Sequence, residues 1–208
     1  MKSRIAWMFL ALLPAGLAPA ANAAAPDTTE TIVLIRHAEK PAAGLGQLDC
    51  QGLNRALALP PVLSRAFGKP AAIFAPNPAE QKTDNGIPYN YVRPLATVEP
   101  TAIAFGLPVH TDIGESQIDA LGARLDLPIY HDAYVLVAWE HTEAALLARA
   151  LLREHGGDPN AVPDWKGSDF DSIYVLKIHR SGSATTATFE LRHEGLDGQK
   201  TSCPGGAG

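Results

Sequence analysis

Cysteine is scarce in this chain, and several functional patterns are missing from it. Only two cysteines occur among 208 residues. No G-x-S-x-G string is present, which argues against the nucleophile elbow of a serine hydrolase. Lysine and arginine do not cluster as phosphate-backbone binding requires, so nucleic acid is not expected as a partner. Beyond residue 23 no apolar run is long enough to cross a bilayer, so no stable membrane span is expected after loss of the leader.

The histidines do not form a zinc-binding pattern. None of the seven has a second histidine at the short spacing of an open metal site. We therefore expect no metal and no cofactor. The seven histidines are His37, His110, His131, His141, His155, His179 and His193.

The first 23 residues have the layout of a cleavable secretory signal. A basic start carrying Lys2 and Arg4 is followed by an apolar stretch and by the small residues 21–23. A retained amphipathic anchor is the alternative. Removal of this segment takes away two positive charges and no acid, so the formal charge of −5 becomes −7. We expect residues 24–208 to form one exported domain, periplasmic or secreted.

Export changes the interpretation of the two cysteines. In an oxidising compartment, a distant pair in loop-like contexts is more often a disulfide than a metal site. We therefore predict a bridge between Cys50 and Cys203, with two unrelated thiols as the alternative. The bridge would fasten the C-terminal tail to the segment after the first strand.

Apolar runs alternate with helical patterns through most of the chain, as in an α/β protein. Strands are predicted at 31–35, 71–75, near Val109 and at 133–138, and a hairpin at 171–178 and 185–191. Helices are predicted at 52–67, 97–105, 115–125 and 142–154. Residues 60–61 are two prolines that should kink or restart the first helix, and 76–90 reads as a long loop. The expected fold is a three-layer α/β/α domain with a mostly parallel central sheet.

Two of these strands end in polar residues. The run 31–35 stops at Arg36, His37 and Glu39, and the run 134–139 stops at Glu140 and His141. Ligands of open α/β sheets bind outside the carboxyl ends of the strands. The two histidines are therefore expected to converge in space.

This arrangement resembles the histidine phosphatase superfamily, the phosphoglycerate mutase-like enzymes. The resemblance runs from IRHAEKP through GLNRAL and RPLATVEPTAIAFGLPV to VLVAWEHTEAALLARALL. It implies that His37 is the nucleophile that accepts the phosphoryl group. It also implies that Arg36, Arg93 and His141 hold the phosphoryl oxygens. Guanidiniums suit that task because they offer fixed bidentate donors.

The acid that protonates the leaving oxygen is less well marked. Superfamily members use an acid between the pocket arginine and the second histidine, or an aspartate directly after that histidine, and Thr142 stands in that last place here. Glu140 is the first candidate because it leaves the same strand end as His141, and Glu115 is the second. An enzyme without a dedicated acid is the third possibility. Lys40 has no required role.

The sequence thus predicts an exported, metal-independent phosphatase that hydrolyses a small phosphorylated substrate through a phosphohistidine. A catalytically silent domain that binds a phosphorylated or anionic ligand is the alternative. Tyr89 and Tyr91 in the predicted loop are candidates for stacking on the substrate. Arg55 is expected to be a solvated or salt-bridged helix residue.

Overall fold

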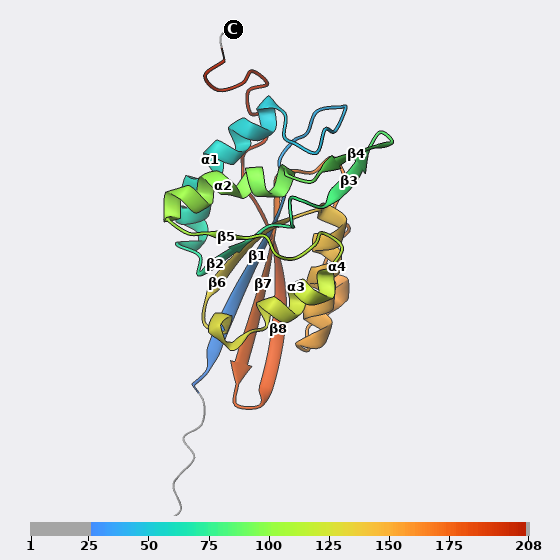
Figure 1. Ribbon diagram of the computed structural model, residues 1–208. Helices are drawn as coiled ribbons and strands as arrows, with labels where there is room; N and C mark the ends of the chain where they lie inside the picture. Colours follow the sequence, from blue (N-terminus) through green and yellow to red (C-terminus); the bar gives the residue numbers. More distant parts are fainter. Residues whose placement is uncertain (1–25, 207–208) are drawn as a thin grey trace, which may run out of the picture.

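A six-stranded sheet forms the centre of the computed structural model, which describes residues 26–206 (Figure 1). The strand order is β5-β2-β6-β1-β7-β8. Strands β5, β2, β6 and β1 pair in parallel, whereas β7 pairs antiparallel with β1 and with β8. The strands are β1 (Thr28–Arg36), β2 (Ala72–Phe74), β5 (Val109–His110), β6 (Tyr134–Trp139), β7 (Ser172–Ser181) and β8 (Ala184–His193).

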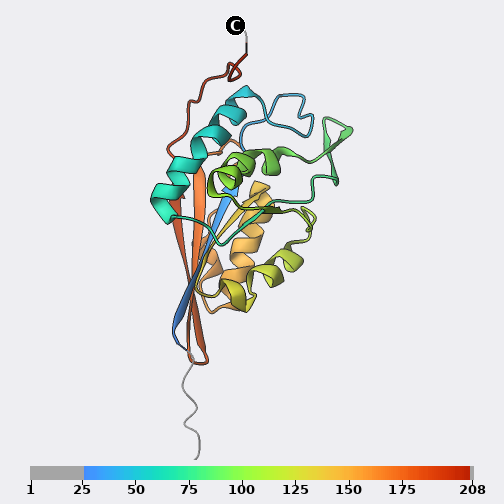
Figure 2. The same cartoon turned by 60° about the vertical axis from the view of Figure 1, so that its left-hand side comes forward.

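Helices cover both faces of this sheet, which confirms the predicted three-layer architecture (Figures 1 and 2). Helices α1 (Cys50–Phe67) and α2 (Arg93–Phe105) pack on one face, and α3 (Ile118–Leu125) and α4 (His141–Glu154) on the other. Strand β1 shows why both layers are needed. Ile32 and Leu34 join the core under α3 and α4, whereas Val33 and Ile35 join the core under α1 and α2. Its apolar run is therefore buried on both sides.

Both helices that carry prolines are longer than predicted, and the first does not restart at its prolines. Helix α1 is one helix of 18 residues that runs through Pro60 and Pro61, capped at its start by the Asp49 side chain. Burial of Leu59 and Leu63 keeps the segment helical despite the two missing amide donors. Helix α2 begins at Arg93, four residues before the predicted start, so Pro100 lies inside it.

The predicted loop 76–90 contains a two-stranded hairpin instead. Strand β3 (Gln81–Asp84) pairs antiparallel with β4 (Ile87–Asn90). Asn85 and Gly86 connect them with φ values of 51° and 83°. Positive φ at both central residues is what a tight hairpin turn requires, and Asn-Gly is its preferred sequence. The hairpin lies beside the loop that follows β1 (Figure 1).

The C-terminal tail is fastened to the start of α1. The predicted disulfide between Cys50 and Cys203 is present, with the two Cα atoms 4.5 Å apart. The Asn54 side chain also donates hydrogen bonds to the carbonyl oxygens of Lys200 and Ser202. The predicted leader, residues 1–23, lies outside the described residues. Within residues 26–206 no helix is long and apolar enough to span a membrane.

Candidate active site

The carboxyl ends of β1 and β6 lie side by side and deliver the two predicted histidines to one place. Arg36, the last residue of β1, pairs in register with Trp139, the last residue of β6. The pairing continues one step further, because the His37 amide donates a hydrogen bond of 3.0 Å to the Trp139 carbonyl. His37 and Glu140 therefore leave adjacent strand ends.

His37 is a buried imidazole with a defined proton position. Its Nδ1 lies 2.8 Å from the carbonyl oxygen of Ala38. A carbonyl only accepts, so the neutral ring carries its proton on Nδ1 and has its lone pair on Nε2. Among the described residues, the only hydrogen bond of the His37 ring is this one. Burial, with Arg36 and Arg93 nearby, holds the pKa of His37 well below its usual range, so the ring is an unprotonated nucleophile at neutral pH.

Arg36 is anchored through one nitrogen. Its Nη1 donates to the carbonyl oxygens of Gly167 at 2.8 Å and Asp169 at 2.9 Å. The guanidinium carbon lies 3.9 Å from the centre of the Phe170 ring. The buried Nε has no hydrogen-bond partner among residues 26–206. One donor of this fixed, buried cation is thus left unsatisfied.

Arg93 is the first residue of α2 and is equally buried. Its Nη1 donates to the Asp84 carboxylate at 2.5 Å, while its buried Nε lacks a partner among the described residues. Asp84 also accepts from the Gly46 amide and from Lys40. Burial opposes ionisation of Asp84, but Arg93, the Gly46 amide and Lys40 together lower its pKa to about 2. A carboxylate from the hairpin is therefore bound at this arginine.

His141 begins α4 and is positioned by the residue before it. Its Nδ1 contacts Oε1 of Glu140. Its Nε2 lies close to Gly167, since a Cβ added at that glycine would be 3.6 Å from it. The carbonyl oxygen of Gly167 is one of the two that hold Arg36. Burial and Arg36 lower the pKa of His141, while Glu140 raises it. A bound phosphate dianion would favour the protonated ring, in which Nε2 is a donor.

The two candidate acids have different surroundings. Oε2 of Glu140 caps α4 by accepting from the amides of Thr142 at 2.8 Å and Glu143 at 3.1 Å, and Oε1 faces His141. Oε2 is therefore engaged as the helix cap, while Oε1 contacts the His141 ring without a well-aligned hydrogen bond. Glu115 precedes α3, and one of its oxygens forms an ion pair with Lys82 of the hairpin.

Arg55 holds the His37 loop in place and is a salt-bridged helix residue, one of the two predicted alternatives. It is 1% exposed and donates hydrogen bonds to four carboxylates. One of these belongs to Glu39, two residues after His37. The others belong to Asp171, Glu194 and Asp197. A single guanidinium thus ties the His37 loop to the segment after Phe170 and to the C-terminal tail.

Comparison with known proteins identifies the architecture. No protein-family model and no curated protein sequence matches the chain. A protein of Nakamurella multipartitia described as the phosphohistidine phosphatase SixA is similar in structure, with a TM-score of 0.54 and 16% identity. The match covers 82% of this chain and 98% of that one. The chain has the phosphoglycerate mutase-like fold of the histidine phosphatases.

Two more solved structures are similar at lower scores. The phosphoglycerate mutase of Plasmodium falciparum has a TM-score of 0.49 and 16% identity, covering 81% of this chain and 92% of that one. The mycobacterial glucosyl-3-phosphoglycerate phosphatase has a TM-score of 0.49 and 18% identity, covering 77% and 95%.

Several residues of this candidate site were not identified from the sequence. Thr97 accepts the Ala38 amide at 2.9 Å and donates to the Arg93 carbonyl at 2.9 Å, which joins the His37 loop to α2. Phe170 packs on Arg36, and its ring centre is 6.1 Å from that of His37. The Asn85-Gly86 turn signal could have revealed the hairpin that carries Lys82 and Asp84. Nothing local in the sequence distinguishes Phe170.

Tyr91 and Tyr89 differ in burial. Tyr91, a predicted stacking residue, is 1% exposed and stands edge-on to His37, with ring centres 6.1 Å apart. Its ring is therefore closed to a stacked substrate. Tyr89 is half-buried in β4.

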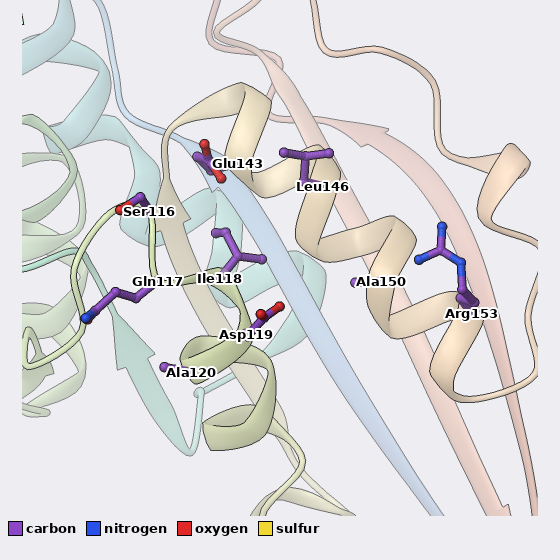
Figure 3. Close-up of a pocket in the computed structure, with 9 residues that line it drawn as sticks. All are labelled: Ser116, Gln117, Ile118, Asp119, Ala120, Glu143, Leu146, Ala150 and Arg153. Atoms are coloured by element: carbon purple, nitrogen blue, oxygen red, sulfur yellow. The ribbon is translucent and has the colours of Figure 1, made fainter.

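A groove of about 530 Å³ lies between α3 and α4, beside the site rather than at it (Figure 3). Glu143, in the first turn of α4, lines its upper end in this view together with Ser116. Arg153 lines the far end. Neither His37 nor either pocket arginine borders it.

Proposed function

We propose that this chain is a metal-independent phosphatase that hydrolyses a small phosphate monoester through a phosphohistidine on His37. One observation carries the proposal: an imidazole with its proton fixed on Nδ1 presents a lone pair on Nε2 beside two buried guanidiniums. Phosphoryl transfer needs mainly a positioned nucleophile and fixed positive charge.

The proposed reaction has two displacements. Nε2 of His37 attacks phosphorus, the new P–N bond forms, and the bond between phosphorus and the leaving oxygen breaks. Arg36 and Arg93 donate to the phosphoryl oxygens through their unpartnered Nε atoms, and His141, protonated once the dianion is bound, donates through Nε2. Water then attacks the phosphohistidine, which releases phosphate and restores the imidazole.

The leaving oxygen must gain a proton in the first displacement. Glu140 is the first candidate from the sequence, but its two oxygens cap α4 and contact His141. These contacts favour a positioning role for Glu140. We therefore propose Glu115 as the donor, since only one of its oxygens is engaged, by Lys82.

A silent anion-binding domain is the second candidate function. It is favoured by the Asp84 carboxylate, which already occupies part of Arg93. If that ion pair persists, the site binds anions weakly and turns nothing over.

We further propose that residues 1–23 are a cleaved signal and that residues 24–208 form one exported domain, periplasmic or secreted. The disulfide between Cys50 and Cys203 supports this, because such bridges persist mainly in oxidising compartments. The acidic charge of the mature chain disfavours nucleic acid as a partner.

The test is a panel of phosphate monoesters, together with phosphohistidine, assayed with and without chelator. We expect phosphate release that chelator does not change and that His37→Ala abolishes. Turnover by folded His37→Ala protein would refute the mechanism. An inert wild type that binds vanadate or phosphate would instead support the silent domain.

A further inference from the structure

Tyr91 carries a buried hydroxyl that the proposed mechanism does not yet use. The residue is 1% exposed, and its hydroxyl oxygen has no hydrogen-bond partner among the described residues. A buried polar group without a partner lowers stability, so such groups are rare and call for an explanation. An absent ligand is one explanation, provided that the hydroxyl lies where the ligand would bind.

The surroundings of Tyr91 place its hydroxyl at the phosphoryl site. Its ring stands perpendicular to His37, and the guanidinium carbon of Arg93 lies 4.9 Å from the ring centre. Lys82 lies 5.2 Å from the same centre. Burial raises the pKa of the phenol, Glu115 and Glu140 raise it further, and Arg93 lowers it through its charge and through a side-chain contact with the hydroxyl. That contact does not meet hydrogen-bond geometry, so it places the hydroxyl beside Arg93 without satisfying it.

Tyr91 also shares its unpartnered state with the two pocket arginines. The Nε atoms of Arg36 and Arg93 are buried and lack partners, as the Tyr91 hydroxyl does. Three donors without partners thus belong to residues that lie around His37. A tetrahedral anion with several acceptor oxygens would satisfy all three at once.

We infer that Tyr91 is a further catalytic residue, whose neutral hydroxyl donates a hydrogen bond to an oxygen of the phosphoryl group during transfer. The inference rests on the proposed phosphatase function and deepens it. The hydroxyl keeps its proton throughout, so the proton for the leaving oxygen comes from elsewhere. The same hydrogen bond forms to the transferring group, to the phosphohistidine and to the phosphate product.

Tyr134 provides a matched control in the same protein. Its hydroxyl is also buried and without a partner among the described residues, and burial alone raises its pKa. It stands at the start of β6, at the opposite end of that strand from Glu140, and packs against Phe67 at 5.4 Å between ring centres. Replacement of either tyrosine by phenylalanine therefore removes one unsatisfied hydroxyl and keeps the ring.

The experiment compares Tyr91→Phe with Tyr134→Phe in the full chain with its disulfide intact. Unfolding in urea should show both variants at least as stable as the wild type, since each loses an unsatisfied buried group. Tyr91→Phe should lower kcat/KM by about 10- to 100-fold, the range for a hydrogen bond to a charged group. Tyr91→Phe should lower kcat/KM equally for aryl and alkyl phosphates. It should also weaken the binding of inorganic phosphate by a similar factor. Tyr134→Phe should change neither.

Unchanged kcat/KM and phosphate affinity in Tyr91→Phe would overturn the inference while the phosphatase function stands. Equal losses in both variants would also overturn it. A loss confined to alkyl phosphates would place the hydrogen bond on the leaving oxygen and reject the assignment made here. If the wild type binds phosphate but hydrolyses nothing, the proposed function fails, and the phosphate affinity of Tyr91→Phe still decides the role of the hydroxyl. A wild type that does neither overturns both.

Discussion

Replacement of Arg55 by methionine should destabilise the protein strongly, and more so at alkaline pH. The guanidinium is 1% exposed and faces four carboxylates. The side chains of Glu194, Glu39 and Asp171 are 0%, 11% and 13% exposed, whereas that of Asp197 is 78% exposed and contributes little. Loss of the cation leaves the buried carboxyl groups of Glu39, Asp171 and Glu194 without their shared partner, at a cost of about 3–5 kcal/mol.

The pH dependence follows from Glu194. Burial raises the pKa of Glu194 to about 8, although Arg55 lowers it. The pKa of Glu194 in the folded protein thus lies above its ordinary value of 4.5. Protonated Glu194 therefore contributes its full stabilisation below pH 4.5, and this stabilisation is lost as the pH rises to 8. Without Arg55 the pKa of Glu194 rises further. Each additional pKa unit lowers the free energy of unfolding by about 1.4 kcal/mol at a pH where the Glu194 carboxylate must ionise. The penalty of Arg55→Met should therefore grow from pH 5 to pH 8.5.

Urea unfolding followed by tryptophan fluorescence, with the disulfide intact, measures this penalty. Arg65→Met is the control, because Arg65 is exposed in the last turn of the same helix. The control should stay within about 0.5 kcal/mol of the wild type. A penalty below about 1 kcal/mol for Arg55→Met, or one independent of pH, would refute the account of the cluster, since a buried cation that mattered would cost more.

Three further outcomes are expected. Removal of the bridge by paired Cys50→Ala and Cys203→Ala changes should cost about 2–5 kcal/mol of unfolding free energy and leave kcat nearly unchanged; mass analysis of the non-reduced protein should show the link. Glu115→Gln should slow alkyl phosphates far more than aryl phosphates, whereas Glu140→Gln should slow both equally; the reverse pattern would make Glu140 the acid. The His37 ring should titrate below pH 6.5 in NMR spectra of the free protein, because burial and the nearby cations disfavour its protonation; an inflection at or above 6.5 would contradict this.

The sequence was sufficient to predict the layers and the strands that present the site. Residues 32–35, just before Arg36, are all apolar, and such a run is buried on both faces of a sheet. The Asn85-Gly86 pair is a hairpin signal, but the strands beside it are short and polar and carry no strand pattern of their own. The proline-containing helices were predicted too short, since tertiary burial overrides a local cost.

The partners of charged residues could not be predicted, because they come from distant segments. Arg55 lies 116 residues from Asp171 and 139 from Glu194, and no helical pattern encodes those contacts. The burial of Tyr91 depends in the same way on His37, which lies in another segment. Residue type and strand position identified the candidate nucleophile, while only the structure showed which hydrogen-bond donors surround it.

The most direct test of the central claim is rapid quenching of the protein with a phosphate ester labelled in the phosphoryl group. A phosphohistidine is expected on the peptide that contains His37, formed no more slowly than kcat and lost in step with phosphate release. His37→Ala should carry no label, and His141→Ala should carry less. Turnover by the wild type without label on His37, or label on a different residue, would contradict the account.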